Sequence, residues 1–224
     1  MTDSIHGAVL FESGPIAERV RNLAEQLNRD DRFEISFVDG DPTAGLHLSP
    51  TENTDDLSTF PTVRAHEAGS ETAYGPTDAS RLEFSELVDI WSRLPDEERL
   101  AKVEALCTWL RAMYTMSPAV VGASVTTPTH ATMLSEEGLP TPLAADGQLQ
   151  DVSWLLLLPP ETVAAHGREH LLGAPVWRTE ELEDGGVLLV TTDDPEPPTA
   201  RLHEPVAAER ALAEHLAMDA GWRD

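Results

Sequence analysis

The stretch VWRTEELEDGGVLLVTT, residues 176–192, is the strongest local indication of the fold. Residues 176–182 and 187–192 each read as a β-strand, and Glu183-Asp184-Gly185-Gly186 lies between them. Asp-Gly-Gly supplies the residues that accept a positive φ, which a tight hairpin turn requires. The stretch therefore predicts a β-hairpin.

The segments around this hairpin predict one more strand and two helices. Ser153–Leu158 is an apolar run short enough for a buried strand. Pro160–Leu172 follows as a helix, because its first turn tolerates proline. A last helix is expected from Pro205 to Met218, with three apolar side chains facing inward: Val206, Leu212 and Leu216.

The first part of the chain alternates strands and helices. His6–Phe11 reads as a strand, Ile16–Leu27 as an amphipathic helix and Phe33–Val38 as a second strand. Two further strands are expected at Leu46–Leu48 and Thr62–His66. The chain therefore opens with a β-α-β pattern and continues with strands joined by polar, proline-bearing connections.

The middle of the chain predicts two amphipathic helices, Leu82–Leu94 and Asp96–Tyr114, separated by Pro95. Asp96 is expected to cap the second helix through its side chain. After these helices, Val120–Val125 reads as a strand and the pattern of the first half restarts.

The second of these helices carries the only cysteine, Cys107. Its apolar positions predict one buried face: Leu100, Val103, Leu106, Leu110 and Met113. A packed thiol on this face is the favoured interpretation over a nucleophile, because buried cysteine behaves as a small hydrophobe. Trp91 and Trp109 are expected in the core on the two central helices.

Together these elements predict an α+β fold with helices packed on a mostly antiparallel sheet. The 224 residues suit a single domain spanning 1–224. Because the pattern restarts near residues 115–120, an internal division into 1–117 and 118–224 is also expected.

The charge balance is extreme. The chain has 40 Asp plus Glu against 15 Lys plus Arg, a formal net charge of -25, and Lys102 is its single lysine. Such self-repulsion burdens a compact state in dilute buffer, whereas about 1 M salt shortens the Debye length to roughly 3 Å. We therefore expect a halophilic, cytoplasmic protein of the kind found in haloarchaea.

Several classes of function are disfavoured. The Arg residues lie scattered among acids, which argues against nucleic-acid binding and against binding to an anionic membrane. No apolar run approaches the roughly 18 residues of a membrane span, and Met1-Thr2-Asp3-Ser4 lacks a cationic leader. Phosphate-loop and dinucleotide-binding glycine motifs are absent, so we expect no cofactor.

One motif offers a catalytic alternative. His166-Gly167-Arg168-Glu169-His170 has the His-x-x-Glu-His form of inverted zinc peptidases. In that interpretation His166 and His170 hold a metal and Glu169 is the general base. The competing interpretation is a pair of surface histidines near a helix end, since Gly167 weakens the helix that must aim them.

A second set of candidates suits binding to a protein. Trp177 and Arg178 lie on the predicted hairpin, and Trp222 lies in a polar tail after the last helix. Tryptophan and arginine are over-represented among residues that dominate binding energy. Trp222 either folds back onto the last helix or is available to a partner.

The C-terminal half, about Ser153 to Leu216, resembles immunity proteins of polymorphic-toxin and type VI secretion systems. The residues that carry the resemblance are Trp154-Leu155-Leu156-Leu157-Leu158-Pro159, Val163, His166-Gly167, Leu171, Ala174-Pro175 and Asp184-Gly185-Gly186-Val187-Leu188-Leu189. The resemblance implies a non-enzymatic α+β protein that occludes a toxin through an acidic face.

The expected function is thus non-catalytic binding of another protein, with immunity to a toxin as its most concrete form. The alternative is a metal-dependent hydrolase that uses His166, Glu169 and His170. A small-ligand sensor with a pocket between the sheet and the central helices is a third possibility, to which no individual residue points.

Overall fold

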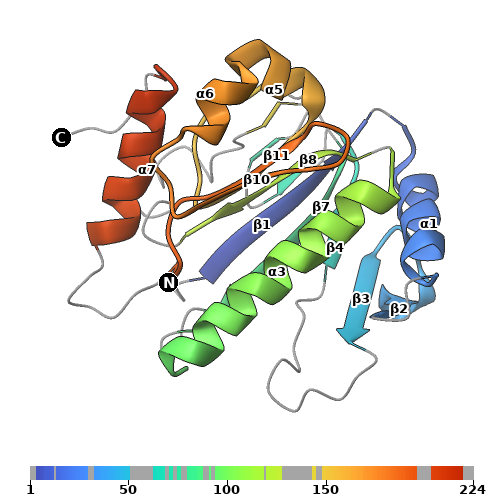
Figure 1. Cartoon of the computed structure of the whole chain (residues 1–224). Coiled ribbons are helices and arrows are strands. Elements are labelled where there is room, and N and C mark those ends of the chain that lie inside the picture. The colour runs from blue at the N-terminus through green and yellow to red at the C-terminus, as the bar shows by residue number, and fades with distance from the viewer. Residues whose placement is uncertain are drawn as a thin grey trace.

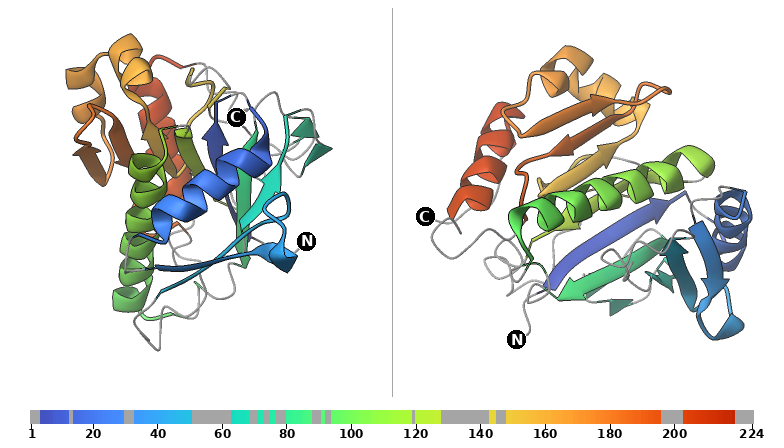
Figure 2. Two further views of the ribbon diagram at one scale, coloured as in Figure 1. Left: turned by 90° about the vertical axis from the view of Figure 1, so that its right-hand side faces the viewer. Right: turned by 60° about the horizontal axis from the view of Figure 1, so that its bottom comes forward.

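The computed structural model describes residues 4–12, 14–29, 33–50, 63–68, 71–72, 75–76, 80–87, 91, 94–118, 120–127, 143–144, 148–195 and 203–218. Among these residues a nine-stranded sheet forms the centre of the molecule, with helices on both of its faces (Figures 1 and 2). No helix in these ranges is both long enough and apolar enough to cross a bilayer.

The sheet has the strand order β10-β11-β9-β8-β1-β7-β4-β3-β2, and every neighbouring pair is antiparallel. This confirms the α+β class and the expected sheet. The strands are β1 (Ser4–Phe11), β2 (Phe33–Phe37), β3 (Gly45–Pro50), β4 (Val63–His66), β7 (Arg81–Leu87), β8 (Val120–Thr126), β9 (Leu155–Leu158), β10 (Arg178–Glu181) and β11 (Val187–Val190). A separate two-stranded pair joins β5 (Glu71–Thr72) to β6 (Gly75–Pro76).

Strand β1 joins the two halves of the chain. It pairs with β7 on one side and with β8 on the other, so strands from before and after residues 115–120 belong to one sheet. Successive side chains of a strand point to opposite faces, and β1 accordingly contributes to two cores. We propose on this ground that the two halves form one domain.

The helices divide between the two faces of the sheet. Side chains of α1 (Ile16–Leu27) and α3 (Asp96–Met116) share one core with Val9 of β1. On the opposite face, α5 (Pro160–His166), α6 (Arg168–Leu172) and α7 (His203–His215) share the second core with Leu10 of β1. A short 3-10 turn, η1 (Val38–Gly40), links β2 to β3.

The predicted helix Leu82–Leu94 is wrong over the part that the structure describes, because residues 81–87 form β7, near the middle of the sheet. Its side chains alternate with period two: Leu82 and Phe84 enter the α1/α3 core, whereas Arg81 and Glu83 form a buried ion pair outside it. Pairing with β1 and β4 thus overrides the helical propensity of the segment. The expectation that Trp91 lies in the core is confirmed, since its exposure is 1%.

Helix α3 agrees with the prediction except at its beginning. Pro95, and not Asp96, occupies the N-cap position, and Asp96 instead pairs with Arg99 one turn later. Leu100 is 42% exposed, so it does not belong to the buried face. The other predicted positions are buried, together with Cys107 and Trp109: Val103, Leu106, Leu110 and Met113.

The helix predicted for Pro160–Leu172 is two short helices. Gly167 has φ 88 and ψ 116 and ends α5, after which α6 begins. This backbone conformation is costly for any residue with a Cβ atom, so glycine decides the break. The last helix begins at His203, and Leu212 and Leu216 are buried as expected, whereas the side chain of Val206 lies outside the described residues.

Candidate functional site

The histidine motif is not assembled as a metal site. Gly167 places His166 at the end of α5 and His170 in α6, and Glu169 pairs with Arg168. The His170 ring stacks on His215 of α7, with 4.1 Å between centroids, and His215 Nε2 lies 2.8 Å from the His170 carbonyl oxygen. Within the described ranges no three His, Cys, Asp or Glu side chains are placed to hold a metal ion.

The binding candidates of the second half differ in their surroundings. Trp177 is 41% exposed at the beginning of β10, and its backbone N–H donates to the Thr191 carbonyl. Arg178 is only partly exposed, and its guanidinium contacts Glu104 of α3 at 2.7 Å and Glu180 at 2.8 Å. Arg178 is therefore paired with two carboxylates of its own chain. Trp222 lies outside the described residues.

The predicted hairpin is confirmed as β10 and β11. The Gly185 N–H donates to the Leu182 carbonyl, and the Leu182 N–H donates to the Gly186 carbonyl. Gly185 has φ 90, the positive φ that the Asp-Gly-Gly turn requires. Asp184 stabilises the turn because its Oδ1 accepts the Gly186 N–H at 2.9 Å.

Three contacts attach this hairpin to α3, and we call them the α3–β10 seam. They follow one another along both elements: Glu104 with Arg178, Arg111 with Glu180 at 2.6 Å, and Tyr114 with Asp184 at 2.7 Å. The seam aligns the last turns of α3 with the hairpin turn.

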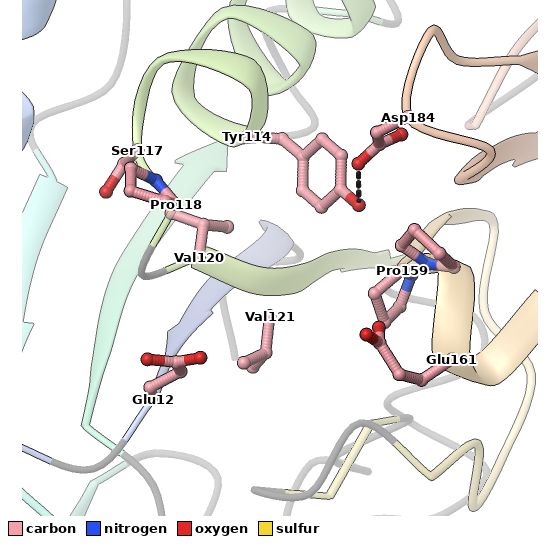
Figure 3. Close-up of a pocket in the computed structure, with 10 residues that line it drawn as sticks. Glu12, Tyr114, Ser117, Pro118, Val120, Val121, Pro159, Glu161 and Asp184 are labelled. Carbon is pink, nitrogen blue, oxygen red and sulfur yellow. Dashed lines mark hydrogen bonds between the residues drawn. The ribbon is translucent and has the colours of Figure 1, made fainter.

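A pocket of about 500 Å³ opens where the seam ends. Its walls come from the end of β1, the last turn of α3, the beginning of β8, the end of β9 with the start of α5, and the β10–β11 turn. The lining residues are Glu12, Tyr114, Ser117, Pro118, Val120, Val121, Pro159, Pro160, Glu161 and Asp184. Figure 3 shows Tyr114 and Asp184 joined on one side and Glu12 and Glu161 on the other.

The pocket carries negative charge. Glu12, Glu161 and Asp184 are exposed at the surface, whereas Tyr114 is buried. Arg19 lies 3.9 Å from Glu12 but outside the lining of the pocket. Burial raises the pKa of the Tyr114 phenol, and the hydrogen bond to Asp184 raises that pKa further. The phenol therefore stays protonated and donates its proton to the Asp184 carboxylate.

The side chains that line the pocket define the chemistry available there. Neither histidine nor cysteine is among the residues that line the pocket in the described part of the chain. A phenol with a raised pKa is a poor base near neutral pH, because it rarely ionises there. The pocket thus offers carboxylates and the apolar surface of prolines and valines, whereas the Tyr114 proton is already donated to Asp184.

Sequence reasoning did not find this pocket. The sequence predicts Asp184 in a turn and Tyr114 at a helix end, but no motif links them to Glu12 or Glu161. Four separate segments of the chain meet here only through the sheet order.

No family model and no curated protein matches the chain. Among solved structures, the chain is similar to the Pseudomonas aeruginosa T6SS protein PA0821, at 12% sequence identity and a TM-score of 0.39. The match covers 94% of this chain and 73% of the other. At this TM-score the likeness carries no argument about fold or function.

Proposed function

We propose that the protein is a non-catalytic binding protein whose pocket receives a basic segment of a protein partner. The observation that carries the proposal is the pocket of about 500 Å³ between Tyr114 and Glu161, with carboxylates from three parts of the chain at its rim. An immunity-type protein, which occludes a toxin by binding it, is the concrete form of this function. That form rests on the sequence resemblance.

Charge complementarity supports a cationic guest. A lysine or arginine side chain has an apolar stem and a charged head, and the pocket presents matching surfaces. Pro159 and Val121 offer apolar contact, whereas Glu161 and Asp184 offer carboxylate oxygens. An arginine is the better fit, because its planar guanidinium makes paired hydrogen bonds with carboxylates.

The metal-dependent hydrolase has less support. His170 is engaged with His215 across α6 and α7, and Glu169 is engaged with Arg168. The described ranges contain no third ligand beside them. A small-ligand sensor would use the same pocket, but the carboxylates favour a basic protein segment.

The remaining acidic residues need another explanation, because among the described residues only Glu12, Glu161 and Asp184 contribute carboxylates to the pocket lining. We propose that they adapt a halophilic protein to a salt-rich cytoplasm. The net charge of -25 therefore does not by itself support a toxin-binding face. What supports binding is the local concave arrangement of Glu12, Glu161 and Asp184.

Calorimetric titration with a hexa-arginine peptide tests the proposal. Glu161→Gln removes one charge from the pocket and leaves the seam intact. Glu97→Gln is the matched control, because Glu97 is exposed in the first turn of α3, about 25 Å from Tyr114 along the helix. We expect Glu161→Gln to weaken binding about fivefold, equivalent to about 1 kcal/mol, and the control to change it little.

Equal weakening by both variants would contradict the proposal, because it would show that the peptide senses only the overall charge. A hexaglutamine peptide should not bind the wild-type protein. Its binding at similar affinity would likewise contradict a cation-selective pocket.

A further inference from the structure

Strand β10 is an edge of the nine-stranded sheet, and its only strand neighbour among the described residues is β11. Leu182 N–H donates to Gly186 O, while Thr191 N–H donates to Trp154 O on the β9 side. Antiparallel ladders alternate, so the main-chain groups of Arg178 and Glu180 face β11. Those of Thr179 and Glu181 face away from the sheet.

The side chains of β10 also divide between two faces. Arg178 and Glu180 point toward α3, where they contact Glu104 and Arg111. Thr179 and Glu181 point toward α6: Thr179 Oγ1 lies 3.5 Å from the Leu172 carbonyl oxygen and Glu181 pairs with Arg168. Each face of this edge strand is therefore held in place by its neighbours before any partner arrives.

The order of charges on this edge is self-complementary. If two copies of the strand pair antiparallel with Thr179 opposite Thr179, Arg178 of each copy lies opposite Glu180 of the other. Thr179 would then exchange two main-chain hydrogen bonds with its counterpart. Arg178 and Glu180 would occupy the non-hydrogen-bonded position, where opposite side chains are closest and ion pairs contribute most.

The exposed Trp177 adds an apolar contact to the same register. Trp177, 41% exposed, is one of two large exposed hydrophobic residues of the described chain, the other being Leu100. Trp177 precedes the paired residues and its own N–H is donated to Thr191, so the register brings it near the end of the partner strand at Glu181 of the partner subunit, whose carboxylate pairs with Arg168. A guanidinium near an indole face is attractive, and exposed tryptophan is typical of interfaces.

We propose that two copies of this chain associate through β10, antiparallel about a two-fold axis at Thr179, so that their sheets become continuous. The proposal assigns Trp177 and Arg178 to self-association and is independent of the pocket at the other end of the hairpin. It commits to a second copy because the alternating Arg and Glu complement themselves in one register.

Salt decides when this dimer forms. Two chains of net charge -25 repel each other over the Debye length, which is about 10 Å at 0.1 M salt and about 3 Å at 1 M. The main-chain hydrogen bonds and the indole contact are far less sensitive to ionic strength. The dimer should therefore be favoured in molar KCl and should dissociate on dilution of the salt.

Analytical ultracentrifugation of the full chain in molar KCl, at the highest soluble concentration, tests the proposal with two variants. Thr179→Pro removes an N–H that faces away from β11, so it costs no bond of the hairpin but blocks pairing with another strand. We expect a dimer for the wild-type chain and a monomer for Thr179→Pro. Near-ultraviolet circular dichroism checks that this variant keeps its fold.

Thr179→Cys keeps the test valid if the proline variant fails to fold. Paired strands place opposite Cα atoms about 5.5 Å apart, within the range that a disulfide spans. Mild oxidation in molar KCl should cross-link this variant into a covalent dimer. Thr43→Cys, exposed at the opposite end of the sheet, is the matched control, and the native Cys107 is buried.

A wild-type monomer in molar KCl would overturn the proposal. So would a folded Thr179→Pro variant that stays dimeric, or equal cross-linking of the Thr179→Cys and Thr43→Cys variants. None of these results would affect the pocket, because the hexa-arginine titration reads a different surface.

Discussion

The Tyr114 hydroxyl donates a 2.7 Å hydrogen bond to Oδ2 of Asp184, and this contact joins the last turns of α3 to the β10–β11 turn. Asp184 also accepts the Gly186 N–H, so one carboxylate stabilises the turn and anchors it to the helix. Both residues line the pocket. The hydrogen bond therefore couples the stability of the hairpin to the shape of the proposed binding site.

Tyr114→Phe should destabilise the protein by about 2 kcal/mol, because a hydrogen bond to a charged group is lost and Asp184 keeps one partner fewer. Urea unfolding followed by tryptophan fluorescence measures the change. Thr115→Val is the matched control: its hydroxyl lies on an exposed part of the same turn and bonds only to carbonyls of α3. A loss no larger than that of the control would contradict the structural role of Tyr114.

The stability of the protein should fall in alkaline solution. Burial raises the pKa of Tyr114 above its ordinary value, and burial raises the pKa of the Cys107 thiol from 9.0 to about 11. In each case the unfolded chain releases a proton at a lower pH than the folded chain. The protonated Tyr114 and Cys107 therefore contribute their full stabilisation below about pH 9. That contribution is lost as the pH rises through 9 and 10 toward the folded-state pKa values.

The unfolding free energy, measured by urea titration at several pH values, checks this sign. Above about pH 10 it should decline less steeply in Tyr114→Phe than in the wild type, because the variant lacks the phenol. A Cys107→Ala variant should instead flatten the decline between pH 9 and 11. If the unfolding free energy declines equally steeply with pH in all three proteins, neither Tyr114 nor Cys107 governs the loss of stability in alkaline solution.

Bound zinc should be absent in stoichiometric amount from protein purified in high salt without added chelator or zinc. The physical reason is that His166 and His170 lie in separate helices and no third ligand is near them in the described chain. Metal analysis of the wild type and of the His166→Ala, His170→Ala double variant is the measurement. Near-stoichiometric zinc that disappears in the double variant would restore the hydrolase hypothesis.

Low salt should destabilise the monomeric protein. Its net charge of -25 produces long-range repulsion that opposes the compact state, and counterions screen that repulsion. Thermal unfolding of the Thr179→Pro variant should therefore occur at a higher temperature in about 1 M KCl than in about 0.1 M KCl. NaCl should act similarly, since screening depends on ionic strength. A midpoint that stays constant or falls with salt would contradict salt adaptation.

Local patterns predicted the elements whose structure depends on neighbours in sequence. The Asp-Gly-Gly turn specifies its hairpin because glycine accepts the positive φ at Gly185. The spacing of Val20 and Leu23 in α1 specifies an amphipathic helix by the same kind of local rule. The burial of Cys107 followed from its place on the apolar face of α3.

Local patterns failed where pairing across the sheet competes with helical propensity. Residues 81–87 contain good helix formers, yet they form a strand because β1 and β4 present open edges on either side. Leu100 has the helical spacing of the buried face but is exposed near the beginning of α3. Neither outcome is encoded in a window of a few residues.

The sequence by itself determined the α+β class, the hairpin, most helices and the strong acidity of this protein, because these follow from composition and from periodicities of a few residues. Only the tertiary structure decided which segments share a site. Glu12, Tyr114, Glu161 and Asp184 meet because the strand order brings β1, β8, β9 and the hairpin together, and long-range pairing leaves no local signature. The same strand order leaves β10 at the edge of the sheet, where Arg178 and Glu180 can pair with the same residues of a second copy.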